Sequence, residues 1–197
     1  GLGLLARLDF TGTRSGHPYA EASLQGGRVE SDFKSGDLRD SLGRGAKYDT
    51  RSSYYGAHIG AGYLWKLGEA GEVDLYGQYL YARRGGDSVS LNTGDPIRFS
   101  AVESQRLRIG GRYAWTANKI KPYAGLAWEH EFDGKAKATA YGYRIDAPDL
   151  KGDTGIVEFG LSLTPSKNTP VSIDLGLQGY AGTREGVSGG IKLEYRF

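Results

Sequence analysis

The stretch YYGAHIGAGYLWKL, residues 54–67, alternates between two kinds of side chain along almost its whole length. Apolar and aromatic residues hold the odd positions, from Tyr55 to Leu67, while glycine, histidine and lysine hold most of the even ones. A period of two indicates a β-strand whose two faces meet different surroundings. The stretch is also long enough to cross a bilayer at a tilt, which takes about 9–11 residues.

The same period extends through the rest of the chain on both sides of this stretch. Apolar residues alternate with polar ones near the start (Leu2, Leu4, Leu8) and again at the end, in Ile191-Lys192-Leu193-Glu194-Tyr195-Arg196-Phe197. No segment has a persuasive helical period. We therefore expect nine strands, at 1–10, 19–26, 53–67, 73–82, 106–115, 120–132, 156–163, 171–180 and 187–197.

The composition narrows the class of protein. The 32 glycines and 14 tyrosines in 197 residues are typical of a membrane β-barrel, in which only every second residue faces lipid. The mean hydropathy is −0.47, and no apolar run approaches the roughly 18 residues of a membrane helix. A net charge of +2 gives no electrostatic case for nucleic acid, and the lack of cysteine excludes disulfides and thiol-based sites.

The predicted connections alternate in length. Those at 11–18, 68–72, 116–119 and 164–170 are short, whereas those at 34–51, 83–101 and 133–153 are long, and only the short hairpin at 182–186 departs from the pattern. Outer-membrane barrels have short periplasmic turns and longer extracellular loops. The pattern predicts an all-β, antiparallel, up-and-down transmembrane β-barrel, or most of one, as a single domain over 1–197.

Strand parity predicts that strands lie upstream of this sequence. A single-chain bacterial barrel has an even number of strands and closes by pairing its first strand with its last. Nine is odd, and the chain begins at Gly1 without methionine or a signal peptide. We expect it to be a piece of a longer precursor that lacks an odd number of strands.

Several stretches resemble the β-domain of type V autotransporters, in order along nearly the whole chain. They are GLLARLDFTGTRSGHPYAEASLQGGRVESDF (3–33), YYGAHIGAGYLWKL (54–67), VDLYGQYLY (73–81), RLRIGGRYAW (106–115) and the most distinctive one, KPYAGLAWEHEFDGKAKATAYGYRIDAPDLKG (121–152). The resemblance implies a twelve-strand barrel with a helix in the pore. By that comparison this chain is the last nine strands, and the first three, the pore helix and the passenger are absent.

The resemblance also implies a function and its partners. The expected role is an outer-membrane translocator that supports secretion of its own N-terminal passenger, with the lipid bilayer, lipopolysaccharide and the barrel assembly machinery as further partners. The amphipathic terminal strand resembles the signal that this machinery reads. Its residues are Leu193, Tyr195 and Phe197.

The alternation assigns polar residues to a wet lumen and aromatic residues to interfacial girdles. Some family members cleave their passenger inside the barrel, but the charges here are more simply explained as cross-lumen ion pairs, so we predict neither catalytic residues nor a cofactor. Three scattered histidines lack metal-ligand spacing, so we predict no metal site. The lumen set is Arg7, Glu21, Asp74, Arg106, Arg108, Arg112, Glu129, Glu131, Glu158 and Asp174; the girdle set is Trp65, Tyr79, Tyr81, Trp115 and Trp128.

Two other classes remain compatible with the sequence. One is a passive porin-like or structural outer-membrane barrel without a passenger, which would be preceded by a signal peptide and three strands. The other is a soluble β-sandwich binding module, which would have to bury its apolar faces against each other.

Overall fold

The computed structural model describes residues 1–39, 43–92, 94–116, 120–145, 148–163 and 171–195, and these ranges form one large sheet and one small one. The large sheet contains β1 (Leu2–Asp9), β2 (Gly16–Arg39), β3 (Gly45–Lys66), β4 (Gly71–Arg84), β7 (Val102–Trp115), β8 (Ile120–Glu131), β11 (Gly152–Leu163), β12 (Val171–Gly182) and β13 (Gly186–Tyr195). Each strand pairs antiparallel with the next in that order.

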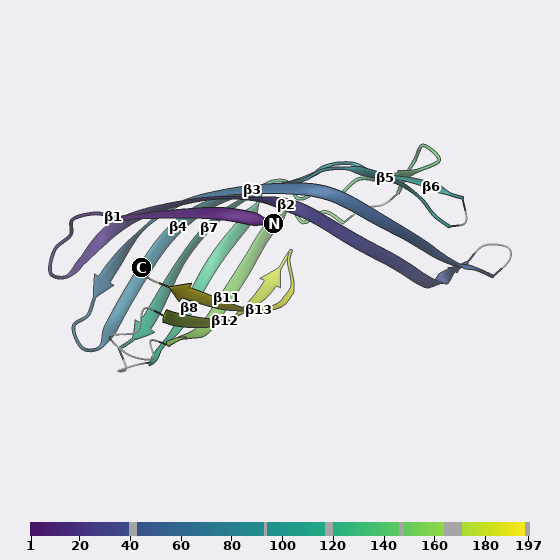
Figure 1. Ribbon diagram of the computed structural model, residues 1–197. Helices are drawn as coiled ribbons and strands as arrows, with labels where there is room; N and C mark the ends of the chain where they lie inside the picture. The colour runs from purple at the N-terminus through teal and green to yellow at the C-terminus, as the bar shows by residue number, and fades with distance from the viewer. Residues whose placement is uncertain (40–42, 93, 117–119, 146–147, 164–170, 196–197) are drawn as a thin grey trace.

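The large sheet curls into a trough (Figure 1). Nine strands run up and down across it within the described residues, and β1 and β13 form its two edges. The alternating sequence therefore folds as an antiparallel meander that makes up most of a barrel, which confirms the predicted fold class. No helix in the described part of the chain is both long and apolar enough to cross a membrane.

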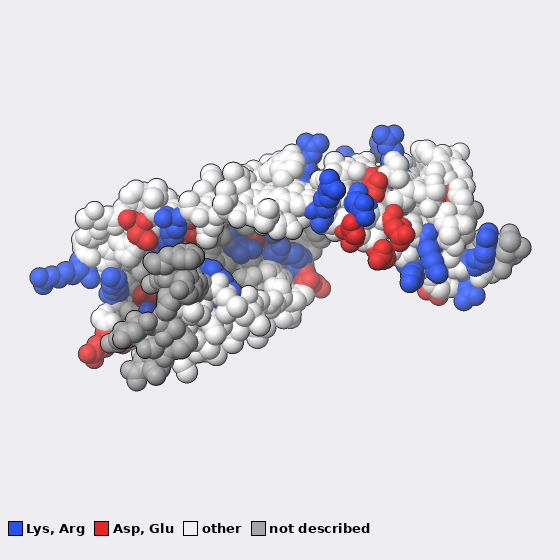
Figure 2. Space-filling model, viewed as in Figure 1, with Lys and Arg blue, Asp and Glu red and all other residues white. Residues whose placement is uncertain are grey.

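The convex side of the sheet is apolar and exposed. Leu4 is 80% exposed, Leu126 68% and Ile191 75%. Side chains at these positions cannot be part of a protein core, because they point away from the other strands. Figure 2 shows a largely uncharged outer surface over the middle of the trough, whereas charged side chains gather inside the trough and on the part of the molecule that projects beyond it.

The three expected long loops all contain strands, so these predictions are wrong in detail. The stretch 34–51 is mostly strand, because β2 and β3 continue as a paired ribbon beyond the rest of the sheet, with Phe33 opposite Tyr48 and Lys34 opposite Lys47. Likewise β4 continues through Arg84, inside the expected loop 83–101. The ribbon is polar on both faces over much of its length, so it lacks the alternation that marks membrane strands.

The connections 83–101 and 133–153 build the small sheet. It is formed by β5 (Asp87–Ser90), β6 (Pro96–Phe99), β9 (Ala138–Ala140) and β10 (Tyr143–Ile145), in the order β10-β9-β6-β5. Asn92, between β5 and β6, joins it to the ribbon. The Asn92 backbone N–H donates a hydrogen bond to the Lys47 carbonyl oxygen and its side-chain amide donates one to the Gly45 carbonyl oxygen, while its Oδ1 accepts one from the Lys47 backbone N–H. The short connections lie at the opposite end, after β1 and β3 (Figure 1). The expected turns at 116–119 and 164–170 lie largely or wholly outside the described residues.

Candidate functional site

The concave face of the trough is polar, and strand register brings its charges into contact. Arg108 of β7 lies opposite Glu129 of β8, and Arg112 lies opposite Gly125, a position with no side chain. That gap allows Arg112 to reach across β8 to Glu158 of β11, 2.8 Å from its Nε. Alternation places the residues on this face, and register decides which of them meet.

Glu129 is the centre of the densest cluster. Its side chain is 3% exposed and accepts two hydrogen bonds from Arg108, at 2.9 and 2.7 Å. Arg184, from the turn between β12 and β13, approaches its other oxygen at 2.9 Å, and Arg106 lies 3.6 Å away. A carboxylate this buried is stable only when charge-assisted hydrogen bonds compensate its lost hydration.

Glu131 extends the polar surface toward the end of the trough with the ribbon, and Asp174 extends it toward the end with the short turns. Glu131 accepts hydrogen bonds from the Ser104 hydroxyl at 2.5 Å and the Gln105 backbone N–H at 2.7 Å. Asp174 on β12 accepts hydrogen bonds from the hydroxyls of Tyr123, at 3.1 Å, and Ser162, at 2.5 Å. Most of these partners are neutral side chains or backbone, so ion pairs alone do not explain the arrangement.

A second polar group lies on the strands near β1. Arg7 stacks on the Tyr19 ring, 3.8 Å from its centroid, and the Tyr19 hydroxyl donates a hydrogen bond to Asp74 at 2.9 Å. Gly62 makes this possible, because a Cβ there would lie 2.5 Å from the Tyr19 ring and hydroxyl. Small residues on the concave face thus leave room for tyrosines to lie flat along the wall.

Sequence reasoning missed a hydrogen-bonded series of Ser23, His58 and Glu21. The Ser23 hydroxyl lies 3.1 Å from His58 Nδ1, and Glu21 Oε1 lies 3.1 Å from His58 Nε2 and accepts a 2.9 Å hydrogen bond from Gln78. Glu21 and Ser23 lie two residues apart, but His58 follows Ser23 by 35 positions, and only the β2–β3 register, with Ser23 opposite His58, reveals the contact.

This series resembles a nucleophile, base and acid, but its surroundings do not suit hydrolysis. β2 pairs with both β1 and β3 here, and β3 pairs with both β2 and β4, so the strand N–H groups around Ser23 are committed to ladders. An oxyanion hole needs donors that are free to meet a developing charge. Among the described residues there is also no group of three or more His, Cys, Asp or Glu side chains placed to hold a metal ion.

The expected girdle residues lie on the convex face. Trp65 and Trp115 stand beside the short turns, 38% and 43% exposed, and each contacts a tyrosine two positions earlier in its strand. Tyr79, Tyr81 and Trp128 lie farther along their strands, toward the end with the ribbon. Of the terminal signal, Leu193 is 71% exposed, only the backbone of Tyr195 is described, and Phe197 lies outside the described residues.

A cavity of about 580 Å³ lies where the trough opens toward the ribbon. Tyr48 stands between Phe33 and Phe99 in its wall, with ring centroids 4.9 and 5.7 Å apart. Arg84 and Ser52, joined by a 2.6 Å hydrogen bond, line it where the ribbon leaves the large sheet. The small sheet thus covers the concave face of the ribbon and makes a partly apolar vestibule at the mouth of the polar trough.

An antiparallel meander with an apolar convex face and a charged concave face defines the class of outer-membrane β-barrels. The particular family follows from comparison: the family model for the autotransporter beta-domain matches residues 2–176. The chain belongs to this family, a family of outer-membrane translocator barrels, and its location is therefore the bacterial outer membrane. No curated protein matches the chain.

Proposed function

We propose that this chain is the membrane-spanning part of an autotransporter that brings its own passenger polypeptide to the cell surface. The observation that carries the proposal is the continuous polar concave face, which leads from the short turns to the vestibule below the small sheet. An extended polypeptide exposes backbone polar groups that lipid cannot satisfy, so it needs a wet path of this kind. Family membership adds the expectation of a passenger.

The sheet edges support further strands in the complete barrel. β1 and β13 are the first and ninth members of an alternating antiparallel order, so they run in the same direction. Two such strands cannot close a barrel by antiparallel pairing, and open edges in lipid would leave backbone groups unpaired. An odd number of additional strands between them resolves both problems, and we propose that they precede β1.

We also propose how the barrel is oriented in the membrane, which partners it meets, and that its concave face is not catalytic. The short turns face the periplasm and the ribbon and small sheet face the outside, as loop lengths in this class indicate. The charged concave face provides a hydrated wall rather than a catalytic centre. The terminal strand, with Leu193, Tyr195 and Phe197, is the part read by the barrel assembly machinery, and lipopolysaccharide surrounds the outer end.

The test uses the natural full-length protein with an epitope near its N-terminus, produced in a Gram-negative host. Protease added to intact cells should remove the epitope, and deletion of β11–β13 should leave it protected inside the cell. An epitope that stays protected although the barrel is assembled in the outer membrane would refute translocation. That result would favour a passive barrel, the second class compatible with the sequence.

A further inference from the structure

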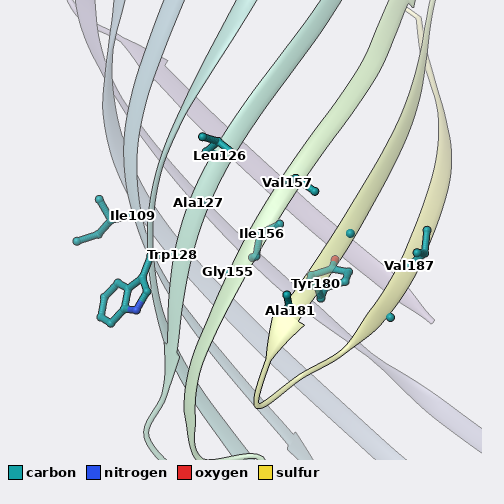
Figure 3. Close-up of a pocket in the computed structure, with 12 residues that line it drawn as sticks. Ile109, Leu126, Ala127, Trp128, Gly155, Ile156, Val157, Tyr180, Ala181 and Val187 are labelled. Atoms are coloured by element: carbon teal, nitrogen blue, oxygen red, sulfur yellow. The ribbon is translucent and has the colours of Figure 1, made fainter.

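The convex face contains a groove. Contact with lipid requires this face to be apolar, but it does not require the face to be hollowed. The groove occupies about 620 Å³ and is bordered by Leu126, Trp128, Val157 and Val187. Its floor has small residues at adjacent register positions, since Gly155 lies between Trp128 on β8 and Ala181 on β12. Figure 3 shows Trp128 and Ile109 on one side of the strands that carry Gly155 and Ala181, and Val187 on the other.

The occupant of this groove must come from the membrane. Its lining lies on the face that meets lipid, because the chain is an outer-membrane barrel and the concave face holds the charges. Lipid tails are as apolar as these side chains, so a tail gains no hydrophobic advantage by leaving the bulk bilayer. It does gain contacts, because a groove surrounds a tail on more sides than a flat wall does.

Polar side chains form a rim beyond the groove, where β8 ends and β11 begins. Two register positions beyond the pair Trp128 and Gly155, His130 Nδ1 lies 2.8 Å from Asp153 Oδ1. The His130 ring stacks on Trp128 with centroids 5.9 Å apart. Asp153 remains 65% exposed, and Lys151 is exposed two residues before it. An aromatic side chain with polar neighbours is typical of the headgroup level of a membrane.

We propose that the groove formed by β8, β11, β12 and β13 binds an acyl chain of lipopolysaccharide, with the headgroup at the rim. The turn between β12 and β13 places this rim at the end proposed to face outside, where lipopolysaccharide forms the outer leaflet. Lys151 suits an anionic phosphate, and Asp153 and His130 suit sugar hydroxyls. The inference rests on the proposed orientation and deepens it by naming the lipid that the surface holds.

The experiment places the photoreactive residue p-benzoylphenylalanine at Val187, which is 81% exposed at the groove. The natural full-length protein is extracted from outer membranes into mild detergent, washed to remove loosely associated lipid, and then illuminated. The reference position is Ile59, which is 63% exposed on β3, outside the groove. Mass spectrometry identifies the lipid attached at each position.

A matched pair of substitutions tests the groove itself. Gly155→Leu fills the floor, and its Cβ meets no heavy atom closer than the Ala181 carbonyl oxygen at 3.7 Å. Gly77→Leu adds the same side chain to the outer face of β4, where a Cβ meets nothing within 4 Å. Both variants should therefore assemble, and the shift in gel migration between boiled and unboiled samples checks that they do.

We expect lipopolysaccharide adducts at Val187 to exceed those at Ile59 after washing. Gly155→Leu should reduce them to the Ile59 level, and Gly77→Leu should leave them unchanged. Equal yields at both positions, insensitivity to Gly155→Leu, phospholipid adducts or protein–protein adducts at Val187 would each overturn the inference while the proposed function stands. Failure of the protein to fractionate with outer membranes would overturn both.

Discussion

Replacing Glu129 by glutamine tests whether the charge cluster holds the barrel wall together. The substitution keeps the shape of the side chain but removes the negative charge that contacts Arg108, Arg106 and Arg184. Its amide –NH2 cannot accept a hydrogen bond, so one side of the cluster also loses its acceptor. Three guanidinium groups then share a concave face from which their principal counter-ion has been removed.

The expected magnitude follows from the burial of the cluster. Removing one partner of a buried ion pair costs about 3–5 kcal/mol, because the remaining charge is left without compensation. Glu129 is 3% exposed and Arg108 14%, but Arg184 is 31% exposed and can recover some hydration. We therefore expect Glu129→Gln to lower the free energy of unfolding by about 3 kcal/mol, the lower end of that range.

Glu30→Gln is the matched control. Glu30 also pairs with an arginine, Arg51, at 2.7 Å, but the two side chains are 65% and 67% exposed on the ribbon. Exposed pairs contribute about 0–1 kcal/mol. The assay is urea unfolding of the full-length protein in lipid vesicles, followed by tryptophan fluorescence. A loss for Glu129→Gln no greater than that for Glu30→Gln would refute the view that the buried cluster stabilises the wall.

Three further outcomes follow from the structure. Gly160→Val should lower the free energy of unfolding by about 1–3 kcal/mol, because its Cβ would overlap the Tyr123 ring and lie 2.5 Å from the Leu175 carbonyl oxygen. In the same urea assay, the control Gly77→Val should change the free energy of unfolding by less than about 0.5 kcal/mol. Equal effects of the two substitutions would contradict this reasoning. Arg184→Ala should release the turn between β12 and β13 from Glu129, so hydrogen exchange at residues 183–185 should accelerate while exchange in β4 stays unchanged; unaltered exchange at the turn would show that the contact does not hold it. The pKa of Asp149 is lowered, chiefly by the hydrogen bond from the Lys151 backbone N–H. This loop contact should therefore be fully present above the ordinary carboxyl pKa of about 3.9 and be lost as the pH falls through the lower pKa of the folded state. An NMR titration of the Lys151 amide with a midpoint at or above the ordinary carboxyl pKa would contradict this prediction.

The period of two determines most of the fold. In segments such as 54–67 and 106–115, lipid on one side and water on the other require alternation, so the sequence itself indicates a membrane strand. That requirement ends where the strands leave the bilayer. The sequence pattern therefore predicts loops at 34–51, 83–101 and 133–153, although backbone pairing continues through the ribbon and the small sheet that lie there.

The sequence by itself determined the fold class and the two faces, because both depend on which residue types recur at a fixed spacing. Its resemblance to the autotransporter β-domain indicated the family, which the family-model match over residues 2–176 confirms. Only the tertiary structure decided which polar residues meet. Ser23 and His58 lie 35 positions apart and meet because the β2–β3 register places them opposite each other. Arg112 and Glu158 lie 46 positions apart and meet because Gly125 leaves space between them. The lipid-facing groove has the same origin, since Gly155 and Ala181 form its floor only because β11 and β12 pair in one particular register.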